Sequence, residues 1–232
     1  MSWEFVAVAG PLGGTTEGPV WDGGGILFTH IPESKIYRYD PETETSREFR
    51  DGTNNANGLT YDSNGRLYAC EGGARRVVTY SDGQTKVLAQ GFEGKKLNVP
   101  NDLAADQEGS IWFTDPFYEG AGGEWSENRS NKELGHDSVY KIELGDGTEN
   151  KVQRVTFDTT RPNGILFSLD YLTLYVAQSG RLSEEKRELR AYPIMPDGTL
   201  GDFTVLHDFG GHRGVDGMVL DTEGNIITCA GL

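Results

Sequence analysis

The sequence predicts an all-β fold, a β-propeller built from four-stranded blades, and two observations carry this prediction. The first is a repeated unit in which a polar residue opens a short apolar run, a Gly/Asp-rich turn follows, and a second apolar run closes the unit. The second is the period: five units open at spacings of 40, 44, 62 and 53 residues, at Glu17, Asn57, Asn101, Asn163 and Asp216. Short strands repeating every ~40–50 residues are typical of propeller blades.

The stretch from Leu97 to Asp115 shows the unit most clearly. Asn101-Asp102 opens it, an acidic turn with Gly109 divides it, and Asp115 closes it. Two strands joined by a tight turn have both of their ends on one side. The sequence therefore predicts that Asn101 and Asp115 lie near each other, at the same end as the other opening residues.

Each of the first four units is followed by two further strand candidates. The third strands alternate polar and apolar residues, as half-buried antiparallel strands do, at residues 35–39, 76–80, 138–142 and 188–192. A turn then leads to fourth strands at residues 47–50, 86–89, 153–157 and 203–206. Four strands per repeat make one blade.

The chain is interpreted as one propeller domain over residues 1–232. The fifth unit ends near Cys229 without outer strands, and a strand expected over Glu4 to Ala9 has no partner within its own hairpin. We therefore expect a C-terminally truncated propeller of the six-bladed type, with a gap between the first and fifth hairpins.

Composition narrows the classes of partner. A formal net charge of −15 argues against nucleic acid and anionic membranes as partners, and its simplest interpretation is a soluble acidic surface. A small-molecule substrate is the expected partner. Cys70 and Cys229 have no metal-site spacing and are predicted to be free, buried thiols in a reducing compartment. The first residues lack the pattern of a signal peptide, and no apolar run has the length of a membrane helix. A cytoplasmic location is predicted, and the oligomeric state is left open.

The five opening residues are the candidate metal site. Innermost strands line the channel of a propeller, so these side chains should converge at one end of it. Two carboxylates and several amide oxygens suit a hard cation, calcium above all, with Mg²⁺ or Mn²⁺ as alternatives and Zn²⁺ held by carboxylates as a further one. Asn-Gly and Asp-Gly are also ordinary turn dipeptides, and for Asn57 alone the turn interpretation is favoured.

Residues near the same end are candidate substrate contacts. His30 and Asp115 close second strands, and they are expected to contact substrate or to orient metal ligands. Asn57, His136 and Arg213 are further candidates. The irregular stretch from Pro116 to Asp137 carries Phe117, Tyr118 and Trp125, and it is interpreted as a lid or pocket wall, with a solvated insertion as the alternative.

Four motifs as a set resemble the gluconolactonase/regucalcin-like (senescence-marker-protein) family of six-bladed propellers. They are Thr16-Glu17-Gly18-Pro19-Val20-Trp21, Asn98-Val99-Pro100-Asn101-Asp102 with Trp112-Phe113-Thr114-Asp115-Pro116, Arg161-Pro162-Asn163-Gly164-Ile165, and Gly214-Val215-Asp216-Gly217-Met218. The resemblance implies a divalent metal, usually calcium, held by Glu17, Asn163 and Asp216, with Asn101 near metal or substrate. It also implies hydrolysis of a lactone, typically of a sugar acid. Val99 stands where regucalcin has a substrate-contacting arginine.

A lactonase mechanism assigns roles to these residues. Asp216 is the candidate general base, and Asn101 is the candidate partner of the oxyanion that develops during attack on the lactone carbonyl. Two alternatives remain: a metal-dependent hydrolase of another ester such as a phosphotriester, and a non-catalytic binding scaffold.

Overall fold

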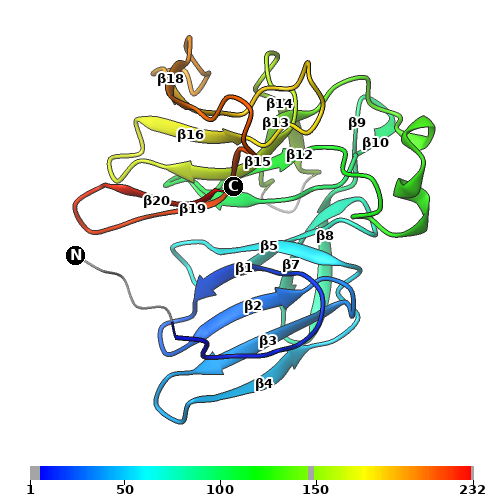
Figure 1. Ribbon diagram of the computed structural model, residues 1–232, viewed down its shortest axis with the longest axis vertical. Coiled ribbons are helices and arrows are strands. Elements are labelled where there is room, and N and C mark those ends of the chain that lie inside the picture. Colours follow the sequence, from blue (N-terminus) through cyan, green and yellow to red (C-terminus); the bar gives the residue numbers. More distant parts are fainter. Residues whose placement is uncertain (1–5, 146–148, 231–232) are drawn as a thin grey trace.

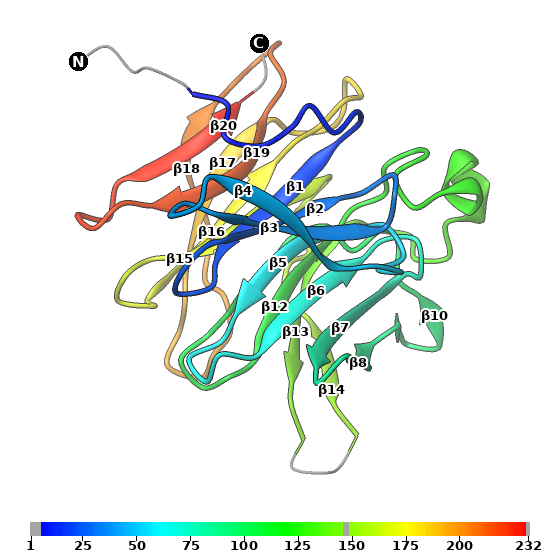
Figure 2. The ribbon, with the colours of Figure 1, turned by 90° about the horizontal axis from the view of Figure 1, so that it is seen from below.

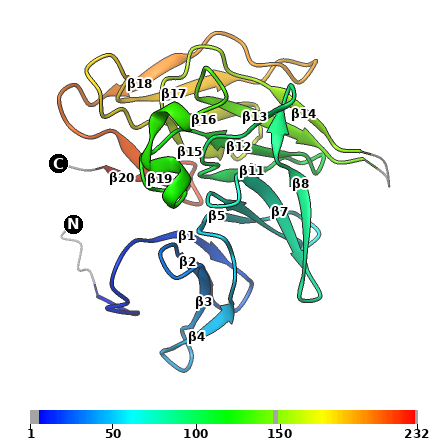
Figure 3. The same ribbon diagram turned by 90° about the vertical axis from the view of Figure 1, so that its right-hand side faces the viewer.

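Successive antiparallel sheets fan around a common centre in the computed structural model, which describes residues 6–145 and 149–230. Figure 1 shows the first sheet, in blue, facing the later ones, in yellow to red. In Figure 3 the first strand of each sheet lies towards the middle, and β4, β8, β14 and β18 lie at the periphery. The predicted all-β propeller architecture is confirmed.

Four of the sheets have four strands in sequential order. Their bounds are β1 Thr16–Trp21, β2 Ile26–His30, β3 Lys35–Asp40 and β4 Thr45–Arg50; β5 Ala56–Tyr61, β6 Leu67–Glu71, β7 Arg76–Ser81 and β8 Gln84–Ala89; β11 Leu103–Ala105, β12 Ile111–Asp115, β13 Ser138–Glu143 and β14 Lys151–Arg154; β15 Pro162–Phe167, β16 Thr173–Gln178, β17 Glu188–Pro193 and β18 Thr204–Asp208. A two-stranded sheet follows, with β19 Val215–Leu220 and β20 Ile226–Ala230. We call these sheets blades one to five.

The core is divided into layers between adjacent blades. Leu27 and Ile36 of blade one pack with Leu59 and Val78 of blade two, and comparable clusters join each later pair of blades. Side chains alternate between the two faces of each sheet, so blades two, three and four each bury one face against the preceding blade and the other against the following one. Burial therefore stabilises the relative positions of neighbouring blades, and with them the positions of the opening residues.

The first strands meet near the centre. β1 packs against β5, β5 against β11, β11 against β15, and β15 against β19. Figures 1 and 2 both place β20 and the start of the described chain on the same side of the molecule. Several large apolar side chains are exposed on the first and fifth blades, among them Trp21 at 56%, Val219 at 56% and Ile227 at 50%.

Some local expectations were wrong. Both cysteines are free, but only Cys70 is buried; Cys229 is exposed, because β20 lies in a two-stranded sheet that no further strand of the described chain covers. Residues 6–9 of the expected N-terminal strand are irregular because no neighbouring strand pairs with them, and Glu4 and Phe5 lie outside the described residues. A small hairpin, β9 Gly91–Phe92 with β10 Lys95–Lys96, was not anticipated. The Pro116–Asp137 stretch contains two 3₁₀ helices, η1 Glu124–Glu127 and η2 Arg129–Asn131.

Candidate functional site

Four of the five opening residues, all except Asn101, lie at β-bulges, and in each of these four a glycine follows the opening residue. The register of the inner hairpin shifts between Glu17 and Val20, Ala56 and Leu59, Pro162 and Ile165, and Val215 and Met218. A bulge leaves one residue unpaired and turns its side chain out of the ladder. The polar opening residue is thereby directed away from the sheet faces that form the core.

The following glycine allows the backbone of the next blade to approach closely. A Cβ on Gly18 would lie 2.3 Å from the Asn57 carbonyl oxygen, and one on Gly164 would lie 2.4 Å from that of Asp216. Gly58 repeats the relationship with blade three, where its amide also donates a 2.8 Å hydrogen bond to the Asn101 carbonyl. We call these three contacts the glycine seams. The Asn-Gly pair that suggested an ordinary turn is therefore part of a blade-to-blade contact.

Two buried threonines secure the same positions. The Thr29 hydroxyl, at the end of β2, lies 3.0 Å from the Asn57 carbonyl of blade two. The Thr114 hydroxyl lies 2.7 Å from the Asn163 carbonyl of blade four and accepts a 3.0 Å hydrogen bond from the Asp102 amide. Each threonine therefore links the blade to which it belongs with the opening residue of the next blade.

Asn163, Asp216 and Tyr118 form one hydrogen-bonded group. The Asn163 side-chain nitrogen Nδ2 donates to Asp216 Oδ1 at 2.7 Å and to the Tyr118 hydroxyl at 3.1 Å. These two bonds use both Nδ2 hydrogens, so Oδ1 is the atom that remains to bind a cation. Asp216 Oδ2 accepts a 3.1 Å hydrogen bond from Arg213, which confirms that Arg213 lies beside this group.

Negative charge accumulates around Glu17. Burial raises the pKa of Glu17 to about 7, with further contributions from the charges of Asp216 and Asp102. Asp102 is partly buried beside this group, and desolvation raises its pKa to about 6, although its carboxylate accepts hydrogen bonds from the amides of Leu103 and Ile165. Like charges raise one another's pKa when no cation neutralises them.

This donor set fits a hard divalent cation. A cation would relieve the repulsion between Glu17 and Asp216, and the free Asn163 Oδ1 adds a neutral oxygen ligand. Within residues 6–145 and 149–230, no three or more His, Cys, Asp and Glu side chains form a group that could hold a metal ion. A site here would accordingly rest on two carboxylates and on amide oxygens.

Asn57 and Asn101 lie on the neighbouring inner segments. The Asn101 amide donates to the Thr114 carbonyl at 2.9 Å, which confirms that this residue lies at the same end of the hairpin as Asp115. In the described part of the chain, the side-chain amides of Asn57 and Asn101 make no hydrogen bond, so both remain available to a ligand. Their joint coordination of one ion with Glu17 and Asp216 stays a prediction.

Two expected substrate contacts are buried instead. His30 is 1% exposed, and its Nε2 lies 2.6 Å from the Gly13 carbonyl because the segment before β1 folds over it. Asp115 is fully buried and accepts a hydrogen bond of 2.8 Å from the Asn98 amide; burial raises its pKa well above the usual range. The structure therefore gives direct structural partners to both side chains, and the expectation that they face substrate was wrong.

The Pro116–Asp137 stretch, called the insertion from here on, reaches the candidate site through Tyr118. Tyr118 is 6% exposed, and its ring centroid lies 5.0 Å from the guanidinium carbons of both Arg161 and Arg181. Phe117 is fully buried and packs edge-on against Trp125. These contacts favour the pocket wall over the solvated insertion.

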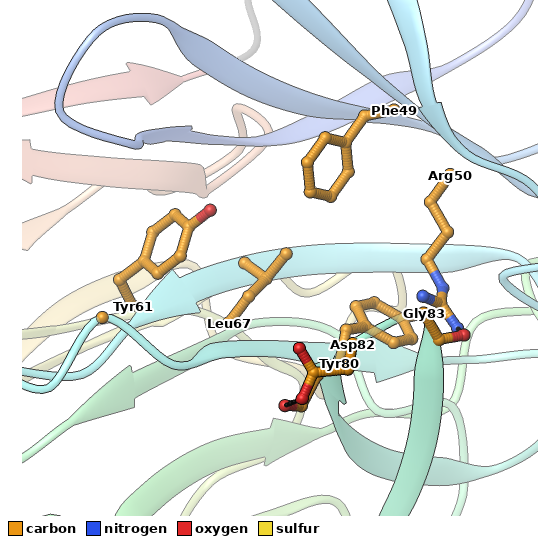
Figure 4. Close-up of a pocket in the computed structure, with 9 residues that line it drawn as sticks. Phe49, Arg50, Tyr61, Leu67, Tyr80, Asp82 and Gly83 are labelled. Carbon is orange, nitrogen blue, oxygen red and sulfur yellow. Dashed lines mark hydrogen bonds between the residues drawn. The ribbon is translucent and has the colours of Figure 1, made fainter.

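His136 ends the insertion but lines a different cavity, between blades two and three. Another cavity, of about 280 Å³, lies between blades one and two, and Figure 4 shows Phe49 and Arg50 facing Tyr61, Leu67 and Tyr80 across it. Arg50 is fixed there by a 2.8 Å hydrogen bond to the Thr85 hydroxyl and lies 4.1 Å above the Tyr80 ring. Neither cavity is lined by an opening residue.

Sequence reasoning did not assign roles to Asp102, Thr29 and Thr114. Asp102 carried a signal, because an acid directly follows Asn101, whereas a glycine follows the opening residue in each of the other four repeats. The threonines carried a weaker one, as both precede the last residue of a second strand.

Comparisons with known proteins identify the family and agree with the propeller fold. Residues 15–231 match the model of the SMP-30/gluconolactonase/LRE-like region. A gluconolactonase of Zymomonas mobilis is 27% identical, over 93% of this chain and 64% of its own length. A gluconolactonase structure from Xanthomonas campestris superposes with a TM-score of 0.79 at 31% identity, covering 93% of this chain and 69% of that one.

A structure of regucalcin from Agrobacterium tumefaciens, described as a calcium-binding protein, shares the fold with a TM-score of 0.68 at 21% identity, over 93% of this chain and 67% of that one. In the described residues, no helix has the length and apolar character needed to cross a lipid bilayer. The family model matches residues 15–231, nearly the whole of this chain. The chain therefore belongs to the SMP-30/gluconolactonase/LRE-like family.

Proposed function

We propose that this chain contributes the catalytic site of a divalent-metal-dependent lactonase that opens the lactone of a sugar acid. The observation that carries the proposal is the Tyr118–Asn163–Asp216 group, which leaves one amide oxygen free beside two carboxylates. Gluconolactonases among the similar proteins support the reaction class. The chain spans about 64% of the curated gluconolactonase that it matches, so the activity of the whole protein belongs to this proposal.

Glu17, Asn163 and Asp216 would hold the metal, with Asn101 completing the set. Calcium fits these oxygen donors best, and Mg²⁺, Mn²⁺ or Zn²⁺ are alternatives. When bound, the ion supplies a Lewis acid that polarises the lactone carbonyl.

The protein's own groups supply positioning and proton transfer. Asp216 Oδ2 faces the half-exposed Arg213 and accepts the proton of the attacking water. The unpaired Asn101 amide donates to the oxyanion that develops on the carbonyl oxygen. Tyr118 keeps Asn163 turned so that its Oδ1, and not its Nδ2, is presented to the site.

The test measures calcium binding by calorimetry and the opening of D-glucono-δ-lactone by pH-stat, with the spontaneous rate subtracted. The chain is compared with Asp216→Asn and with Asp202→Asn, a control on an exposed loop. We expect Asp216→Asn to lower turnover by about 10²–10⁴-fold, the usual contribution of a general base, and the control to be unchanged. Calcium binding with no accelerated lactone opening would refute the lactonase assignment and retain the metal site.

A further inference from the structure

A cavity of about 600 Å³ between blades two and three is lined by both polar and apolar side chains. Phe92 and Lys95 of the β9–β10 hairpin, Leu134 and His136 at the end of the insertion, and Arg154 and Phe157 at and after β14 are among its lining residues. None of the opening residues lines it, so the cavity is separate from the candidate metal site.

His136 makes its hydrogen bonds within the protein through Nδ1. The Ser138 hydroxyl lies 3.0 Å from Nδ1 and the Tyr140 hydroxyl 3.4 Å from it. The Ser138 oxygen also accepts a 2.9 Å hydrogen bond from Arg154 Nε, so its own hydrogen is available to Nδ1. His136 Nε2 has no protein partner in the described part of the chain, and an anion bound there would select the tautomer with the imidazole hydrogen on Nε2 and with Nδ1 accepting from Ser138.

Arg154 is held in place by its Nε alone. That atom also donates to the Thr156 carbonyl at 2.9 Å, which leaves the terminal nitrogens Nη1 and Nη2 free. Among the described residues, Arg154 forms no ion pair. Ser138 contacts both His136 and Arg154. This one serine thus places His136 Nε2 and the terminal nitrogens of Arg154 on the same wall of the cavity.

The electrostatic field at this wall is positive in a chain whose net charge is −15. Burial, together with the positive charges of Arg154, Lys132 and Lys95, lowers the pKa of His136 to about 4. Lys132 is paired with Asp137, and Glu93 is the one carboxylate among the residues that line the cavity. Charge complementarity therefore favours an anion over a neutral or cationic ligand.

Phe92 and Phe157 form an aromatic wall of the cavity. Phe157 is 75% exposed, and the Arg154 guanidinium carbon lies 4.6 Å from its ring centroid. Phe92 packs edge-on against Tyr140, with centroids 5.2 Å apart, which fixes its ring at the cavity. A phenylalanine as exposed as Phe157 gains buried area when a flat apolar group covers it.

We propose that this cavity is a binding site for a small aromatic oxyanion. Its carboxylate or phosphate is bound by His136 Nε2 and Arg154, and its ring lies between Phe92 and Phe157. Carboxylate and phosphate share the chemistry that these donors recognise, and a planar guanidinium can bind two oxygens of either group. The site does not depend on the proposed lactonase activity.

The test uses the whole chain and four probes: benzoate, phenyl phosphate, inorganic phosphate and benzyl alcohol. Binding is followed by ¹H–¹⁵N NMR titration, which locates each probe. Phe157→Ser tests the aromatic wall with little risk to folding, because the side chain is already exposed. Arg154→Gln tests the charge, and Arg47→Gln, on exposed β4, is the matched control.

We expect benzoate or phenyl phosphate to shift the amides around His136 and Phe157, and the tighter of the two identifies the preferred oxyanion. Loss of a charge-assisted hydrogen bond in Arg154→Gln should weaken binding about tenfold, Phe157→Ser should weaken it several-fold, and Arg47→Gln should not change it. Equal affinity in all three variants, equal binding of benzyl alcohol, or shifts confined to the opening residues would overturn the proposal. Inorganic phosphate binding as tightly as phenyl phosphate would overturn the role of the aromatic wall.

Discussion

The Asn163 side-chain nitrogen donates to Asp216 Oδ1 across 2.7 Å, between strands of blades four and five. This bond joins two proposed metal ligands, one neutral and one charged, and it fixes which end of the Asn163 side-chain amide is free. When both hydrogens of an asparagine side-chain nitrogen are donated to protein acceptors, only the side-chain oxygen remains to contact a ligand. The second acceptor is Tyr118, so the insertion after β12 has a direct influence on the candidate metal site.

Removing the Tyr118 hydroxyl should weaken metal binding more than folding. In Tyr118→Phe the ring stays between Arg161 and Arg181, but Asn163 loses one acceptor and its amide gains freedom to rotate. We expect calcium affinity to fall by about 10–100-fold, as for other groups that orient metal ligands. Calorimetry measures this, with Tyr61→Phe as the control; equal affinity in Tyr118→Phe and the parent chain would show that the hydroxyl does not orient Asn163.

Replacing Thr114 by valine should disturb both stability and the site. The substitution leaves the Asn163 carbonyl and the Asp102 amide without their hydroxyl partner. We expect the free energy of unfolding to fall by about 1–3 kcal/mol, the cost of unsatisfied buried polar groups, and metal affinity to fall with it. Urea unfolding and calorimetry measure the two effects.

The control for Thr114 is Thr79→Val in blade two, whose hydroxyl donates to the Leu67 carbonyl at 2.9 Å within one sheet. It should lower stability without altering metal affinity. If both variants changed metal affinity to the same extent, the effect would be a general loss of stability and not a loss of positioning.

A methyl group at Gly164 should open the seam between blades four and five. The added carbon of Gly164→Ala would lie 2.4 Å from the Asp216 carbonyl, a backbone atom that cannot move without shifting β19. We expect a loss of about 1–3 kcal/mol in stability, as for other overpacked sites, together with weaker metal binding. Gly217→Ala is the matched control, because an added carbon there meets no atom within 4 Å. Thermal unfolding that is unchanged in Gly164→Ala would contradict the seam.

Acid should destabilise the chain partly through His136. The unfolded imidazole takes up a proton as the pH falls through its ordinary pKa of 6.5, whereas burial and the neighbouring cations lower the folded pKa to about 4. Between these values the unfolded state binds more protons, so stability is lost as the pH falls from 6.5 to about 4.

The variant His136→Gln should lose less stability than the parent chain between pH 7.5 and pH ~4.5, by up to about 1 kcal/mol, because solvent screens this partly exposed group. Urea unfolding at the two pH values measures the difference, with His207→Gln, exposed on β18, as the control. An identical loss in parent chain and His136→Gln would show that His136 titrates alike in both states.

The propeller architecture and the group around Asp216 were predictable because both depend on repetition. A polar residue at the same register in Glu17, Asn163 and Asp216 reflects one backbone geometry used again, and a period survives small errors in strand boundaries. The bulges themselves were not predicted, because an Asn-Gly or Asp-Gly pair is compatible with a turn as well.

Other placements depended on the paths of irregular segments. His30 is buried because the segment around Gly13 folds back over it, and no pattern in the sequence specifies that path. His136 likewise sits two residues before β13, but its side chain bonds to Ser138 and faces the cavity between blades two and three. Loop conformation decides such positions, and it follows from packing rather than from periodicity.

The glycine seams have a consequence for cooperativity. Gly18, Gly58 and Gly164 each contact the opening residue of the following blade, so the atoms that join neighbouring blades are the neighbours of the atoms that would bind the ligand. In repeat proteins, stability is a sum of terms for single repeats and terms for the interfaces between them. A ligand bound at this centre would therefore strengthen several interface terms at once, and hydrogen exchange in β1, β5, β11, β15 and β19 would slow together.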